Sequence, residues 1–206
     1  MSRFSFLSVP MLVVAAAVLP GISIAGWEVD PTHTHIGFQV SHLKLTKTPG
    51  IFKRFESTLV FDEQAIEKSS VKFVIDATSI DTAHEGRDKD LQGPDWFSAA
   101  AHPTITFASS KVRPAGGNKY WIDGDLTLRG KAIPVTFSAV LTNRTDHPWH
   151  KIPAVGFEAT TTIKRSAFGM TQHLGAISDD VTLSVALERR SLEARVLATP
   201  VLPSPP

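Results

Sequence analysis

Asp179-Asp180-Val181-Thr182-Leu183-Ser184-Val185-Ala186-Leu187-Glu188 decides the fold, together with the segment from Ala154 to Met170 that precedes it. In both stretches, mostly apolar residues at odd positions alternate with polar or small residues at even positions. A period of two is typical of β-strands with one apolar face. The connection, Arg165-Ser166-Ala167-Phe168-Gly169-Met170, places an arginine, an aromatic residue and a glycine where the first strand ends. We therefore expect two long paired strands whose shared apolar face lines the inside of a closed sheet.

Length and composition limit the classes of protein to which the chain can belong. Its 206 residues, 42% of them hydrophobic and 20% charged, suit one well-filled globular domain. The chain contains no cysteine, which excludes disulfides, a thiol nucleophile and zinc–cysteine sites. Its formal charge is +1 and no basic block stands out, so nucleic acid is not an expected partner.

The first residues have the layout of a secretory signal peptide. Arg3 is followed by an uncharged apolar run that ends in Ser23-Ile24-Ala25, a small-residue cleavage pattern. An uncleaved anchor is the alternative, but Pro10 and Pro20 interrupt the run. We predict that residues 1–25 are removed and that the mature protein works in a periplasm or outside the cell. Residues 26–189 are predicted to form one domain, and residues 190–206 a proline-rich disordered tail.

Hairpin-linked strands fill the predicted domain. The turns are expected at Pro49-Gly50, Gly116-Gly117 and Arg129-Gly130. A polar insertion at residues 79–91 is expected to be a short helix between the third and fourth strands, with a second helical turn capped by Asp95. Consecutive strands without strand–helix alternation favour an all-β, eight-stranded antiparallel barrel, with a two-sheet sandwich as the alternative. The eight predicted strands are residues 35–42, 55–61, 71–77, 104–109, 122–128, 133–141, 155–163 and 181–187.

Phenylalanines are concentrated on the predicted inward rows. Plain core packing explains any single one of them, but together they either fill the barrel or line a tunnel. Small residues on the same rows, such as Gly124, Ala139 and Ala159, are expected to leave room. A tunnel of this kind suits a long acyl or prenyl chain, because each buried methylene contributes about 0.8 kcal/mol.

Polar residues near the ends of these rows are candidates for contact with a ligand head group. His42 and Arg165 each end an apolar row, and Arg87 and Asp88 lie in the helical insertion. Arginine pairs with phosphate through its planar fork, although an Arg–Asp pair that only holds the insertion in place is an open alternative. The predicted ligand-binding set is Phe38, Val40, His42, Phe55, Phe73, Ile75, Arg87, Trp96, Phe97, Phe107, Phe137, Phe157, Arg165 and Phe168.

Metal and catalytic sites are not expected. His33 and His35 would face the same way on a strand, but no third ligand has a fixed spacing to them. The sequence contains no serine-elbow, glycine-rich phosphate loop or paired histidine–glutamate motif. Asp179 and Asp180 point to opposite faces of a strand, so they are interpreted as a turn that enters the last strand.

Several short stretches of the sequence follow the motifs of one known family, in that family's order: Asp30–His33, Ile36–Leu43, Ser79–Thr82, Arg87-Asp88 with Leu91, Phe97, Pro103–Phe107, Gly124–Gly130, Gly156–Ala159, Arg165–Met170 and Asp180-Val181. Through them the sequence resembles the YceI-like family of polyisoprenoid-binding, lipocalin-like proteins. The resemblance covers residues 27–188 and implies an extended eight-stranded barrel with a lipid tunnel. It also implies a periplasmic, non-enzymatic binder of isoprenoid or similar chains, such as a quinone, with no cofactor of its own and often dimeric.

A periplasmic lipid carrier or sequestering protein is therefore the main hypothesis. One alternative is an interaction or dimerisation module that uses an exposed sheet edge. The other is an enzyme that acts on an exported amphiphile with His42 or His33 as its base.

Overall fold

The computed structural model describes residues 27–191. The predicted signal peptide, residues 1–25, and residues 192–206 of the predicted tail lie outside the described residues. Arg190 and Ser191, which were predicted to open the tail, instead continue the last strand, where Ser191 pairs with Trp27. The described domain therefore ends later than the pattern of apolar residues indicated.

Strands dominate the described part of the chain. Three 3-10 helices, η1 (Ile66–Lys68), η2 (Ala77–Ser79) and η3 (Arg165–Phe168), and one α-helix, α1 (Glu85–Leu91), accompany them. The strands are β1 (Trp27–Val29), β2 (His35–His42), β3 (Thr46–Phe52), β4 (Phe55–Val60), β5 (Ser70–Asp76), β6 (Ile80–Asp81), β7 (Thr104–Gly116), β8 (Lys119–Leu128), β9 (Lys131–Asp146), β10 (Pro153–Lys164) and β11 (Ile177–Ser191).

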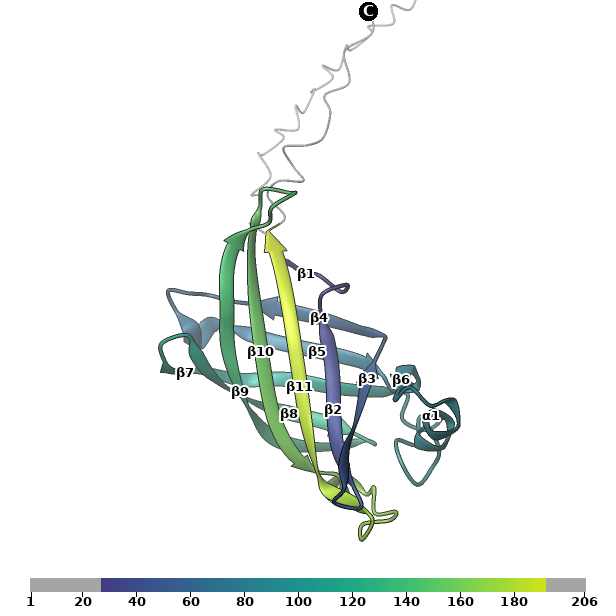
Figure 1. Ribbon diagram of the computed structural model, residues 1–206. Coiled ribbons are helices and arrows are strands. Elements are labelled where there is room, and N and C mark those ends of the chain that lie inside the picture. The colour runs from purple at the N-terminus through teal and green to yellow at the C-terminus, as the bar shows by residue number, and fades with distance from the viewer. Residues whose placement is uncertain (1–26, 192–206) are drawn as a thin grey trace, which may run out of the picture.

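All the strands belong to one antiparallel sheet that curls into an open barrel. Its order is β4-β5-β7-β8-β9-β10-β11-β2-β3-β6, and β1 pairs with β11. In Figure 1, β10, β11 and β2 run along one side of the barrel, and β5, β7 and β8 cross behind them at a steep angle. Among the described residues no ladder joins β3 to β4, although only Lys53 and Arg54 separate them. The single curled sheet confirms the predicted barrel rather than the sandwich.

The hairpin of β10 and β11 forms as the sequence predicts. Its ladder runs without a break from Ala154 opposite Arg190 to Lys164 opposite Asp180. Helix η3 turns the chain between the strands, and Gly169 ends it at φ +86°, a left-handed conformation that glycine adopts at little cost. The odd positions of both strands face the barrel interior.

Strand β3 was missed in the sequence, and the turn predicted at Pro49-Gly50 is wrong. The chain turns earlier, at Leu43-Lys44, and Pro49 lies at an exposed position inside β3. Gly50 is needed there because the Phe38 ring crosses it. A Cβ atom added at Gly50 would lie 2.2 Å from Phe38 Cζ. The barrel therefore has more strands than the eight predicted.

The helical insertion lies where it was predicted, between β5 and β7, but it is shorter. Only Glu85–Leu91 is helical, capped by His84, whose Nδ1 accepts a hydrogen bond from the Arg87 backbone N–H. The preceding residues form β6, which pairs with the end of β3. The second helical turn expected after Asp95 is wrong, because that segment forms successive turns.

Gly124 does not leave open space on its inward row, contrary to the prediction. The Phe107 ring lies against it, 2.7 Å from the position of an added Cβ atom. Phe107 in turn packs edge-on against Phe137 with ring centroids 5.1 Å apart. The glycine thus lets an aromatic ring lie flat on the barrel wall.

Candidate functional site: an apolar cavity inside the barrel

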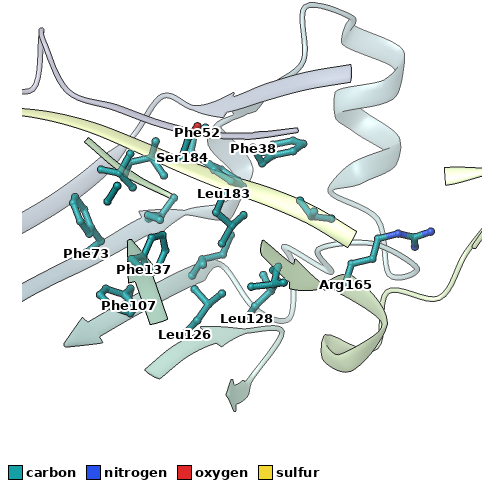
Figure 2. A pocket seen from close by; sticks show the side chains of 18 of the residues that line it. Phe38, Phe52, Phe73, Phe107, Leu126, Leu128, Phe137, Arg165, Leu183 and Ser184 are labelled. Carbon is teal, nitrogen blue, oxygen red and sulfur yellow. The ribbon is translucent and has the colours of Figure 1, made fainter. Parts of the chain in front are cut away.

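The inward rows enclose a cavity of about 480 Å³. This volume lies within the range of roughly 300–1,000 Å³ typical of small-molecule sites. Figure 2 shows Phe73, Phe107, Phe137, Leu126 and Leu128 around it. The interior is therefore not a solid core, which was the alternative to a tunnel.

Aromatic pairs build much of the cavity wall. Phe38 and Phe52 lie 5.9 Å apart between ring centroids. Phe61 packs edge-on against both Phe157, at 5.0 Å, and Tyr120, at 5.9 Å. Edge-to-face contacts of this kind are a favoured arrangement of aromatic rings, so these rings support one another within the wall.

The structure brings most of the predicted binding residues to this cavity. Two do not line it. Phe55 packs against Phe73 from behind, at 6.4 Å between centroids, and Phe168 is 1% exposed within the packed core beside η3. The set that lines the cavity is Phe38, Val40, His42, Phe73, Ile75, Arg87, Trp96, Phe97, Phe107, Phe137, Phe157 and Arg165. Contact between these residues and a ligand stays a prediction.

Arg165 lies at one end of the cavity and is 2% exposed. Its guanidinium donates to three backbone carbonyls, those of Met170 (2.7 Å), Ser178 (2.9 Å) and Ile177 (3.0 Å). It also lies 5.2 Å from the Trp96 ring. Burial lowers the pKa of Arg165, and the nearby charge of Asp179 opposes that effect. Because these carbonyls accept three of the five N–H donors of the guanidinium, Arg165 holds the loop at the cavity end.

Arg87 and Asp88 do not form the Arg–Asp pair that was an alternative interpretation. Both bond to Thr82. The Asp88 carboxylate accepts from the Thr82 backbone N–H at 2.8 Å, and Arg87 donates through Nε to the Thr82 hydroxyl at 2.8 Å and through Nη2 to its carbonyl at 2.7 Å. Helix α1 is thereby fixed beside the cavity, which Thr82 and Arg87 also line. Arg87 remains exposed enough to reach a polar group of a ligand.

Several cavity residues were missed in the sequence. Phe52 and Thr48 face the cavity from β3. This strand was not predicted, because the Pro49-Gly50 pair was interpreted as a turn. The sequence signal for this strand was weak, because Thr48 and Gly50 share the inward row with Phe52. Met170 and His173 line the cavity from the loop after η3. Their positions depend on how that loop closes, and no periodic pattern encodes it.

A separate polar cluster lies around Asp30, which is 2% exposed. Its carboxylate accepts hydrogen bonds from the Thr32 N–H (2.9 Å) and hydroxyl (2.7 Å) and from His33 Nδ1 (2.9 Å), and Arg190 lies 3.3 Å away. Burial raises the pKa of Asp30, but the hydrogen bonds from His33 and Thr32 and the charge of Arg190 outweigh it and hold the pKa at about 2. The hydrogen bond to Asp30 raises the pKa of His33.

The same cluster offers the one group of possible metal ligands among residues 27–191. Ligand atoms of Asp30, His33 and Glu188 lie within 4.8 Å of one another. The arrangement fits an ion-pair cluster better than a cation site, because the Asp30 carboxylate already has donors on both oxygens and a guanidinium beside it. His33 precedes β2, so the expectation that His33 and His35 face the same way on one strand is wrong.

A curled antiparallel sheet around an apolar cavity is the architecture of a barrel that binds hydrophobic ligands. The model of the YceI-like domain matches residues 27–189. The chain therefore belongs to the YceI-like family, which confirms the resemblance seen in the sequence.

Known relatives support both the family and the fold. Protein YceI of Escherichia coli O157:H7 is 38% identical over 166 residues, which cover 80% of this chain and 86% of the relative. The crystal structure of Burkholderia cenocepacia BcnA matches with a TM-score of 0.71 at 30% identity and covers 78% of this chain and 99% of BcnA. A polyisoprenoid-binding domain from Saccharophagus degradans matches with a TM-score of 0.61 at 14% identity, covering 81% of this chain and 99% of that domain, and shows likeness of fold alone.

Between Trp27 and Ser191 no helix combines the length and apolar character needed to cross a bilayer.

Proposed function

We propose that this protein binds the hydrocarbon chain of a polyisoprenoid or similar amphiphile, such as an isoprenoid quinone or a prenyl phosphate, inside the barrel. The observation that carries the proposal is the cavity of about 480 Å³ with aromatic and aliphatic walls. Ten buried methylene-sized units would contribute about 8 kcal/mol before the costs of ordering the ligand. Such a chain therefore needs few polar contacts to bind.

The distribution of polar groups orients the ligand in this proposal. Among the polar lining residues, Arg87 belongs to α1 and His173 to the loop after η3. Figure 2 shows Arg165 of η3 at one end of the cavity and Phe107, Phe137 and Leu126 around its interior. A polar head group is better solvated near the first set than among the second. The hydrocarbon tail accordingly extends from the α1 end into the barrel.

The role we infer is transport, storage or sequestration outside the cytoplasm rather than catalysis. The location rests on the signal-like residues 1–25 of the sequence. Two features favour binding over catalysis: the cavity wall is mainly apolar, and His33, one of the two candidate bases, is bonded to Asp30 away from the cavity. His42, the other candidate base, lies exposed at the cavity edge.

Native mass spectrometry of protein purified without detergent tests the proposal. We expect a bound lipid that can be extracted with organic solvent. Alternatively, we expect stoichiometric uptake of an added prenyl quinone, measured by the quenching of Trp96 fluorescence. Failure of both, with the protein folded by circular dichroism, would refute it. Turnover of the added amphiphile that is lost in His42→Ala would favour the enzymatic alternative.

A further inference from the structure

The hairpin between β2 and β3 exposes apolar side chains at its tip. Leu45 is 79% exposed and Leu43 is 51% exposed. The turn is closed by a hydrogen bond from the Leu45 N–H to the His42 carbonyl at 3.0 Å. Two of the three residues of the loop are therefore exposed leucines, and clustered exposed apolar side chains of this kind are candidates for contact with an apolar surface.

The backbone of this turn favours other residues. Leu43 has φ +53° and Lys44 has φ +58°. The loop has three residues, because His42 pairs with Thr46, and Leu43 and Lys44 are the central residues of its β-turn. Asn-Gly is strongly preferred where both central residues of a β-turn have positive φ, because other side chains are strained there. The chain nevertheless has a leucine and a lysine at these positions. Strain kept at an exposed turn points to a function of the side chains.

A second loop adds to the same surface. Leu174 is 42% exposed in the loop between η3 and β11. The two loops touch directly, because the Leu43 N–H donates to the Ala176 carbonyl at 2.6 Å. We call Leu43, Leu45 and Leu174 the leucine rim.

The leucine rim borders the end of the cavity. His42 and Thr48, at the two sides of the hairpin, line the cavity, as do His173 and Ile177 on the neighbouring loop. In Figure 1 both loops lie together at the lower end of the barrel, on the same side of the molecule as α1. This is the end where the proposed head group would lie.

The charged residues of the two loops themselves are Lys44 and Lys47, and the nearest carboxylates along the chain, Asp179 and Asp180, follow the second loop. Residues 42–48, His-Leu-Lys-Leu-Thr-Lys-Thr, contain two lysines and no carboxylate, and residues 170–178 contain neither aspartate nor glutamate. Apolar tips flanked by lysines match the surface of a bilayer that contains anionic phospholipid, where the leucines enter the acyl region and the lysines meet phosphate. A second copy of this chain would instead bring the lysines of two rims together.

We propose that the leucine rim inserts into the surface of an anionic phospholipid bilayer and holds the cavity end against the membrane, so that a lipid chain passes between bilayer and barrel with little exposure to water. The inference rests on the proposed lipid-binding function and adds its partner, the membrane surface.

Co-sedimentation with vesicles tests the inference. Vesicles of phosphatidylcholine with phosphatidylglycerol are compared with vesicles of phosphatidylcholine alone. The rim variant is Leu43→Asn/Lys44→Gly/Leu45→Thr, which gives the turn its preferred Asn-Gly pair and should keep the fold. We expect its partitioning to the anionic vesicles to fall about tenfold or more, because two leucines and one lysine are lost. Binding by the wild type should weaken with added salt and on the neutral vesicles.

The matched control is Trp149→Ser at the β9–β10 hairpin, at the opposite end of the barrel in Figure 1. Trp149 is 83% exposed but lies beside His147, with ring centroids 5.4 Å apart. We expect this variant to bind vesicles as the wild type does. Equal binding by the rim variant, no vesicle binding by the wild type, or loss only in Trp149→Ser would overturn the inference. Conversion of a dimer to a monomer in the rim variant, without vesicle binding, would assign the rim to self-association and overturn it too.

Uptake of a dispersed prenyl quinone without vesicles separates this inference from the proposed function. The rim residues lie outside the cavity wall, so the rim variant should take up quinone normally. Vesicle binding without uptake would refute the proposed function alone, and uptake without vesicle binding would refute the rim alone.

Discussion

Ala159→Phe tests whether the cavity is real space that a ligand needs. Ala159 lies in the middle of β10, between Ala139 on β9 and Val185 on β11, and its side chain lines the cavity. A phenyl ring at this position points into the barrel and occupies part of the space of about 480 Å³.

The stability change has a different sign for an open cavity and for a packed core. In open space the ring gains burial and should stabilise the fold by about 2 kcal/mol. In a packed core, added atoms force strain and should destabilise it by roughly 1–3 kcal/mol. The ring displaces about four to six methylene-sized units of ligand, each worth about 0.8 kcal/mol, so the lipid Kd should rise by about two to three and a half powers of ten.

Urea denaturation gives the stability change from the midpoint at constant slope, and quinone titration gives the Kd. The matched control is Thr160→Phe, the neighbouring residue on the exposed face of the same strand, which should leave the Kd unchanged. Destabilisation by Ala159→Phe, or an unchanged Kd in a folded variant, would refute the view that the ligand occupies this space.

Three further changes follow from packing and charge. Asp30→Asn should lower the free energy of unfolding by about 2 kcal/mol at pH 7, because a folded-state pKa of about 2 gives stability that is present above pH 3.8 and lost as the pH falls towards 2. The raised pKa of His33 adds stability below pH 6.5 that is lost as the pH rises through the folded-state pKa, so His33→Gln should remove this loss of stability with rising pH. Urea denaturation at several pH values checks both. Arg189→Met removes a 4% exposed arginine whose pKa burial lowers to about 10 and whose Nε has no partner among the described residues. It also removes the contact of the guanidinium with the Trp27 ring, 4.6 Å away, so the expected net stabilisation is only about 1 kcal/mol. Arg190→Met should instead destabilise the protein by loss of the Asp30 contact. Gly124→Ala should destabilise the protein by roughly 1–3 kcal/mol, because the new Cβ atom would lie 2.5 Å from the Ala108 carbonyl oxygen. Gly175→Ala is the control and should be near neutral, because its Cβ atom would meet nothing within 4 Å. Thermal unfolding of the two variants distinguishes these outcomes.

Period-two patterns predicted most of the barrel because one face of each strand is buried and the other is not. The pairing of β10 with β11 and the inward rows of β5 and β8 follow from this alone. Strand β3 was not predicted because its inward row contains Thr48 and Gly50, which contribute little to a hydrophobic pattern. Gly50 is required by the ring of Phe38, which comes from a different strand, so only the assembled sheet explains it.

The candidate site was predictable as a set of apolar residues, but the roles of its polar groups were not. Arg165 was correctly placed at the end of a row, yet its three carbonyl partners depend on the closure of residues 170–178. Arg87 and Asp88 converge on Thr82 through the geometry of β6 and α1. Backbone acceptors have no sequence signature, because every residue carries one.

The missing ladder between β3 and β4 makes the barrel a split ring. Enlarging its girth at that seam disturbs only a few bonds, such as those from the Lys53 and Arg54 backbone N–H groups to Ser79. Enlarging it anywhere else would separate a full row of inter-strand bonds. We therefore expect the barrel diameter to adapt to thinner or thicker ligands at the seam between β3 and β4. Amide hydrogen exchange should be fastest along this seam.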